Sequence, residues 1–200
     1  IGYYPEATPY QIDSTDSEII LIQFGGPSGW GYLSYDQLYA GSAELAKLGE
    51  FRDGVFFRHR GANLAPGVKK NQDGYEAIWE HVFQRPIEYP KQRYASPVIM
   101  NPESFPWVSD VSEPGAARRN LGVFSERNVA IAQIKLAPGA TLSEAAPAAP
   151  RFFLVLDGTG MAADTAIRKH SLVKLEIGEQ AAFKAETELQ LLMTTLPAFT

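Results

Sequence analysis

Residues 138–160 read PGATLSEAAPAAPRFFLVLDGTG, and this stretch decides the expected fold. The β-prone run at 151–156 is bounded by two turn pairs, Pro138-Gly139 before it and Asp157-Gly158 directly after it. Similar short runs divided by Pro and Gly recur at 98–100, 128–136, 171–177 and 189–196. This spacing is typical of a sandwich or barrel. The sequence therefore predicts a mainly β domain over residues 96–200.

The earlier part of the chain carries helix signals. Asp73 is an expected N-cap with Glu76 three residues later, and the helix is expected to run through Phe83 until Pro86 ends it. Residues 54–57 form a short β-prone segment, and residues 3–24 suggest a strand, a turn and a second strand from 18 to 24. A helical segment is thus expected between two β-rich parts.

The glycine-rich stretch FGGPSGWGYLSYDQ (24–37) follows an apolar run and invites a chemical interpretation. A phosphate-binding P-loop would need Lys where Tyr32 stands, and a dinucleotide fingerprint would need Gly where Ser34 stands. A nucleophile elbow would need Gly where Trp30 stands. Ser34 and Gln37 instead form a capping box for a helix over 35–48. The loop is predicted to turn the chain into that helix.

Composition sets limits on function. The 200 residues are 45% hydrophobic, carry a formal net charge of −5 and contain no cysteine. An acidic chain lacks the basic field that nucleic acid or an anionic membrane attracts, and no apolar run reaches the roughly 18 to 20 residues that span a bilayer. Without cysteine there is no disulfide, thiolate nucleophile or zinc ribbon. We expect a cytoplasmic protein with neither nucleic-acid nor membrane partners.

Two segments of the β half resemble the cupin superfamily of RmlC-like β-barrels. PGATLSEAAPAAPRFFLVLDGTG keeps both outer glycines of the first cupin motif, Gly139 and Gly158, at the family's separation. HSLVKLEIGEQAAFKAE (170–186) keeps Gly178 of the second motif. The resemblance implies a cupin-like double-stranded β-helix, or jelly-roll barrel, preceded by a helical connector.

The same alignment leaves the metal-binding places of the resemblance without suitable donors. They hold Ala145, Pro147, Arg151 and Ala181. A mononuclear site for iron, manganese or zinc needs about three to four converging imidazole or carboxylate ligands. Alanine and proline offer none, and an arginine would place a cation where the metal belongs. We therefore expect no metal or other cofactor in the C-terminal barrel.

The opening segment YYPEATPYQIDS (3–14) resembles the end of another second cupin motif. Pro5 is kept, Ala7 replaces glycine and Tyr10 replaces histidine, and the chain begins with Ile1 rather than Met. The resemblance then implies the later portion of a two-barrel (bicupin) protein, with a transition metal in an upstream barrel. The expected parts are 1–24 as the end of a first barrel, 25–95 as a connector with two helices, and 96–200 as the C-terminal barrel.

Arg151 is the first candidate ligand-binding residue. In the barrel alignment its side chain starts on an inward strand face, where an unpaired guanidinium is costly. It should meet a carboxylate, with Glu144 or Glu176 as local candidates, or bind an anionic ligand. Both interpretations stay open on the sequence alone.

Four further residues complete the candidate ligand-binding set: Tyr10, Arg58, His59 and Arg60. Arg58-His59-Arg60 is the most concentrated positive feature of the chain, and arginine forks bind carboxylates with two hydrogen bonds. Ion pairs to Glu50 or Asp53 would explain it equally well.

The leading functional expectation is a metal-free cupin module that acts as a scaffold, a dimerisation domain or a binding domain for a small carboxylate or aromatic molecule. The alternative is part of a metal-dependent bicupin enzyme, a dioxygenase, decarboxylase or isomerase, whose active barrel lies mainly upstream of Ile1. A third hypothesis is a metal-free isomerase or cyclase that uses Arg151 with a tyrosine. Whether the chain is catalytic stays open, and open sheet edges favour a homo-oligomer.

Overall fold

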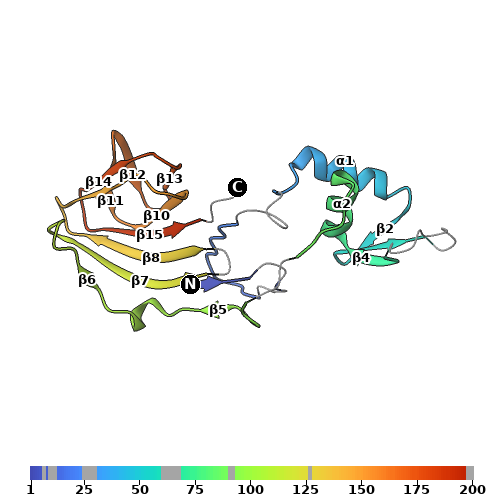
Figure 1. Ribbon diagram of the computed structural model, residues 1–200, viewed down its shortest axis with the longest axis horizontal. Coiled ribbons are helices and arrows are strands. Elements are labelled where there is room, and N and C mark those ends of the chain that lie inside the picture. The colour runs from blue at the N-terminus through green and yellow to red at the C-terminus, as the bar shows by residue number, and fades with distance from the viewer. Residues whose placement is uncertain are drawn as a thin grey trace. The chain divides into compact units, whose positions relative to one another are not determined.

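The computed structural model describes residues 1–5, 8, 13–23, 31–59, 69–89, 93–125 and 128–196 (Figure 1). The chain divides into two compact units. One combines Ile1–Gln11 with Gln92–Thr200, and the other is Ile12–Lys91. The fold is mainly β with two helices, as the sequence predicts. The three predicted parts, 1–24, 25–95 and 96–200, stay a prediction as domains.

The first unit is built on two antiparallel sheets. The six-stranded sheet has the order β13-β10-β15-β8-β7-β6 and the four-stranded sheet the order β12-β11-β14-β9. Sequence neighbours are often not sheet neighbours, which is the crossing connectivity of a jelly roll. The strands are β6 (Val108–Ser109), β7 (Ala116–Phe124), β8 (Val129–Leu136), β9 (Thr141–Glu144), β10 (Arg151–Asp157), β11 (Thr159–Ala162), β12 (Thr165–Arg168), β13 (Leu172–Leu175), β14 (Ala181–Ala185) and β15 (Leu189–Thr195).

The core lies between the inner faces of these sheets. Side chains alternate along each strand, so Phe153 and Val155 of β10 point to the same face, and both are fully buried. Phe153 meets Phe183 of β14 across the core, with ring centroids 4.8 Å apart. The two rings therefore join the six-stranded sheet to the four-stranded one.

The chain's first residues also belong to this unit. β1 (Gly2–Tyr3) pairs antiparallel with β5 (Val98–Ile99), and the ring of Tyr3 stacks on Phe124 of β7 at 4.0 Å between centroids. The predicted second strand at 18–24 is wrong for its described part, because residues 18–23 form no strand and Leu21 is 60% exposed. An apolar run favours a strand only where another strand can pair with it.

The second unit holds both helices and a three-stranded sheet, β2-β3-β4. Their bounds are α1 (Tyr35–Leu45), β2 (Gly49–Arg52), β3 (Val55–Arg58), β4 (Asn71–Asp73) and α2 (Gly74–Phe83). The core of this unit is formed by Leu45, Phe56, Ala77 and Ile78. In the described part of the chain, neither helix is long and apolar enough to cross a membrane.

Both predicted helix starts are confirmed. The Ser34 hydroxyl accepts from Gln37 N, the Gln37 side chain accepts from Ser34 N, and Asp73 Oδ1 accepts from Glu76 N. α1 ends at Leu45, earlier than the predicted 48, because residues from Gly49 onward pair as β2. Residues 24–30 of the glycine-rich stretch lie outside the described residues, and from Gly31 on the chain leads into the α1 cap as predicted.

The two outer glycines of the first motif-like segment differ in their surroundings. Gly158 has a φ of +85°, and a Cβ built there would overlap the backbone carbonyl oxygen of Glu188. Gly139 has a similar φ of +80° but nothing within 4 Å of a built Cβ. A Cβ at position 158 would thus meet both left-handed backbone strain and a close approach, whereas a Cβ at position 139 would meet the backbone strain alone.

We predict that Gly158→Ala lowers the free energy of unfolding by about 3 kcal/mol, since left-handed strain and overpacking add together. Gly139→Ala, the matched control, should cost only about 1 kcal/mol. Urea unfolding followed by tryptophan fluorescence and circular dichroism measures both. Equal losses at the two positions would contradict the close approach at Gly158.

Candidate functional site

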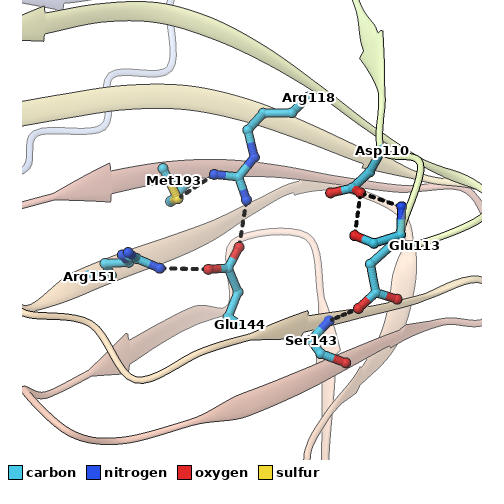
Figure 2. A network of polar contacts seen from close by, with 8 residues as sticks. Asp110, Glu113, Arg118, Ser143, Glu144, Arg151 and Met193 are labelled. Carbon is cyan, nitrogen blue, oxygen red and sulfur yellow. Dashed lines mark hydrogen bonds and ion pairs between the residues drawn. The ribbon is translucent and has the colours of Figure 1, made fainter.

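Three charged side chains meet on the inner faces of the two sheets. Glu144 comes from β9 of the four-stranded sheet, while Arg118 and Arg151 come from β7 and β10 of the six-stranded sheet. Arg118 Nη2 donates to Glu144 Oε1 at 2.7 Å, and Arg151 Nη1 donates to Glu144 Oε2 at 2.7 Å (Figure 2). We call Arg118, Glu144 and Arg151 the triad.

Strand alternation places these residues inside. Leu142 and Glu144 are the buried residues of β9, and Arg151 precedes the inward Phe153 by two positions. Arg118 lies opposite the buried Ile134 in the β7–β8 register. The next residue, Arg119, points to the other face, where it donates to Gln133 at 2.6 Å and to Glu103 at 2.9 Å. Two consecutive arginines therefore have different surroundings.

The triad carries a formal net charge of +1 in a largely desolvated place. The Glu144 side chain is 5% exposed, against 34% for Arg118 and 27% for Arg151. Arg118 Nη1 donates to Met193 Sδ at 3.6 Å, and a thioether is a weak acceptor. Arg151 Nε is buried with no hydrogen-bond partner among the described residues. The two guanidiniums thus keep donor capacity that the protein uses poorly.

An open pocket of about 500 Å³ gives access to Arg118. Its other lining residues are Val108, Ser109, Asp110, Val111, Ser112 and Asn120. Val108 of β6 lies directly opposite Arg118 of β7, and Asn120 follows two residues further along β7. Cross-strand partners and residues two apart share a face of a sheet. The pocket therefore lies on the inner face of the six-stranded sheet, at its β6 edge.

The donor set of the triad does not fit a cupin-type metal centre. Both oxygens of its one carboxylate already accept from arginines, and guanidiniums repel a cation. Ala181, at a metal-ligand place of the resemblance, lies opposite Glu144 in the β14–β9 register and offers no donor. Among the described residues no group of three His, Cys, Asp or Glu could hold a metal ion. The site's chemistry is that of hydrogen-bond donation to an anion.

The structure pairs Arg151 with Glu144, one of its two predicted partners. Glu176, the other, pairs with Lys174 instead. The alignment assigned the ligand place to the next residue, Ala145, but that residue is exposed and Glu144 is the inward one. The period of two that starts from Leu142 is the signal that places this carboxylate inside.

Sequence reasoning missed Arg118 and its strand, β7. The signal was present in AARRNLGVF (116–124), where Ala116 and Arg118 share a face of a potential strand. Two adjacent arginines interrupt the apolar pattern of this segment. The partner of Arg118 comes from the other sheet, 26 residues later in the chain, so spacing alone could not identify it.

Arg58 and His59 of the predicted cluster belong to the second unit, whereas the triad belongs to the first. The Arg58 guanidinium lies over the Phe56 ring at 5.2 Å, and its Nε is buried without a hydrogen-bond partner among the described residues. His59 is exposed. The predicted ion-pair partner Glu50 contacts Arg52 instead, at 3.5 Å. Tyr10 and Arg60 lie outside the described residues, and ligand binding by any of these stays a prediction.

Comparison with known proteins finds similarity at the level of fold. No protein-family model and no curated protein sequence matches the chain. Among solved structures, an RmlC-like cupin from Ralstonia eutropha JMP134 is 9% identical, with a TM-score of 0.44 over 50% of this chain and 68% of that one. These values describe a likeness of fold alone.

Two further solved structures carry enzyme names. A predicted oxalate decarboxylase from Thermotoga maritima is 15% identical, with a TM-score of 0.44 over 50% of this chain and all of that one. An acetylacetone dioxygenase from Acinetobacter johnsonii is 15% identical, with the same TM-score over 55% of this chain and 76% of that one. The neighbours are thus RmlC-like cupins and cupin-fold proteins, as the sequence resemblance predicts, and they define no specific function.

We predict that Glu144→Gln lowers the free energy of unfolding by about 3 kcal/mol, because it leaves two partly buried guanidiniums facing a neutral amide. Glu176→Gln removes an exposed ion pair and should cost less than about 0.5 kcal/mol. Urea unfolding of both variants measures the difference. A Glu144→Gln protein as stable as the Glu176→Gln control would show that the charge of Glu144 does not stabilise the fold.

Proposed function

We propose that the β-sandwich unit is a metal-independent cupin-like module that binds a small carboxylate, with Arg118 as its anchor. The observation that carries this proposal is a guanidinium that lines an open pocket while a buried carboxylate fixes its other side. Glu144 orients Arg118 without neutralising both arginines, and the ligand's carboxylate would bind on the side of Arg118 that Glu144 does not occupy.

The hydrogen-bonding state of Arg118 supports this proposal. One of its amino groups is held by Glu144 and the other contacts only a methionine sulfur among the described residues. A ligand carboxylate would be a far stronger acceptor than a thioether, since charge-assisted hydrogen bonds are the strong ones. Binding would therefore give Arg118, which Glu144 already holds in place, a stronger hydrogen-bond acceptor than Met193.

The lining of the pocket agrees with a small ligand that stays partly exposed. Its volume of about 500 Å³ is open to solvent, so the pocket would cover only part of a bound molecule. Val108 and Val111 offer apolar contact, and Val111 is almost fully exposed. A short aliphatic or aromatic acid matches this combination. Of the residues predicted from sequence, Arg151 contributes through Glu144 and through its own positive charge.

The predicted bicupin enzyme and the predicted homo-oligomer stay separate predictions. Elemental analysis of the full-length protein tests the metal of an upstream barrel, and light scattering tests the oligomer. Neither result bears on the pocket beside Arg118, which is formed by residues of this unit.

We predict that benzoate and propionate shift the amide resonances of residues 108–120 in two-dimensional NMR titrations, because their carboxylates reach Arg118. Arg118→Met should weaken this binding about tenfold or more, the equivalent of one charge-assisted hydrogen bond. Arg168→Met removes an exposed arginine of β12 and serves as the control, with affinity unchanged. The proposal fails if neither acid binds, or if both variants bind as the unmodified protein does.

A further inference from the structure

The pocket that contains Arg118 also contains a fixed negative charge, Asp110. Asp110 follows Val108 by two residues, and its N–H donates to the carbonyl of the inward residue Ala116 at 2.9 Å. The extended pairing of β6 with β7 therefore continues to Asp110, which places it on the same inner face as Val108 and Arg118. Figure 2 shows the Asp110 carboxylate beside the Arg118 guanidinium, both above Glu144.

The Asp110 carboxylate is held in position by its own turn. Its Oδ1 accepts from Ser112 N at 2.9 Å and from Ser112 Oγ at 2.6 Å. These hydrogen bonds hold the pKa of Asp110 below its usual value, and the nearby Arg118 adds to the lowering. The group is therefore ionised at neutral pH. A carboxylate has about four acceptor positions, so the two bonds from Ser112 leave capacity for a ligand.

The rest of this loop is tied to both sheets. The Glu113 carboxylate accepts from Ser143 N of β9 at 3.1 Å (Figure 2). The Glu113 carbonyl accepts from Ala116 N at 2.9 Å. Asp110 thus lies in a loop that hydrogen bonds hold to both sheets, so its position relative to Arg118 does not depend on a ligand. Such preorganisation lowers the entropic cost of binding.

We propose that this pocket selects zwitterionic ligands of the amino acid type, whose carboxylate binds Arg118 and whose ammonium binds Asp110. This inference rests on the carboxylate binding proposed above. The ligand's carbon chain would lie along Val108 and Val111, and the side chains of Ser109 and Asn120 supply further hydrogen-bonding groups. The opposite charges of Arg118 and Asp110 are complementary to a ligand with opposite charges at its two ends, and they determine the orientation in which it binds.

The same arrangement works against other acids. A monocarboxylate of equal length would leave Asp110 without a counter-charge and would desolvate it in part. A dicarboxylate would bring a second negative charge toward Asp110, and like charges at contact distance are unfavourable. The order of affinity should therefore be amino acid, then monocarboxylate, then dicarboxylate.

The test compares 4-aminobutyrate, butyrate and succinate, which share a four-carbon chain and differ at one end, with glycine and β-alanine as shorter amino acids. NMR titration of the full chain at neutral pH and low salt should show the best amino acid binding about tenfold more tightly than butyrate. Succinate should bind more weakly than butyrate. This comparison needs no variant, so it decides the proposal even if a substitution disturbs the loop.

Asp110→Asn supplies the second measurement. The amide oxygen still accepts from Ser112, but the charge is lost, so the preference for the amino acid should disappear. 4-Aminobutyrate should bind more weakly than to the unmodified protein, and butyrate should bind at least as tightly, because the penalty that Asp110 imposes on it is removed. Asp164→Asn, in the turn between β11 and β12, is the matched control and should keep the preference.

The outcomes separate the two proposals. Butyrate and 4-aminobutyrate binding equally well, with no effect of Asp110→Asn, would overturn the zwitterion inference and leave carboxylate binding intact. No binding by any of the probes would overturn both, and loss of binding only in Arg118→Met would uphold the anchor.

Discussion

The two ion pairs that Arg118 and Arg151 form with Glu144 are the interactions on which the interior of the sandwich depends. Glu144 joins β9 of one sheet to β7 and β10 of the other, through two arginines at 2.7 Å each. A buried carboxylate is costly unless it is paired and hydrogen-bonded, and here both oxygens are satisfied. Each arginine in turn lies two positions from a buried apolar residue of its own strand, Ala116 for Arg118 and Phe153 for Arg151. The position of the charges and the packing of the sandwich are therefore mutually dependent.

Unequal sheet width explains why this interior can be reached from outside. The six-stranded sheet is wider than the four-stranded sheet, and β6 is its terminal strand beyond β7. Val108 is 65% exposed although it shares a face with buried residues of the neighbouring strands. Where the inner face of the six-stranded sheet extends past the four-stranded sheet, it is either covered by another segment or exposed to solvent. Here the loop with Asp110 and Glu113 lies next to the exposed β6 edge. It places charged side chains where a sandwich with sheets of equal width would have apolar ones.

Local signals allowed the helix starts and four strands of the six-stranded sheet, β8, β10, β13 and β15, to be predicted, because caps, turn glycines and apolar runs act over a few residues. The strands of the four-stranded sheet were not predicted. Ser34 with Gln37 and Asp73 with Glu76 are examples, and each appears in the structure as a hydrogen bond. Residues 18–23 failed as a strand since pairing is a tertiary property. The pair Arg151–Glu144 could be anticipated from inward alternation, whereas Arg118 could not, because its role requires the register of β7 and the approach of the opposite sheet.

An arginine and a metal ion in the interior of a sandwich act differently on an anion. A metal ion polarises its ligand as a Lewis acid, while a guanidinium offers a planar set of hydrogen-bond donors and stays charged at all physiological pH values. Fixing that set with Glu144 makes its direction specific, because the donors turned toward the acid are unavailable to a ligand. The remaining donors face Met193 and the pocket. In the proposed site, the direction of these donors selects the carboxylate of a ligand, and the fixed charge of Asp110 selects the group at its other end.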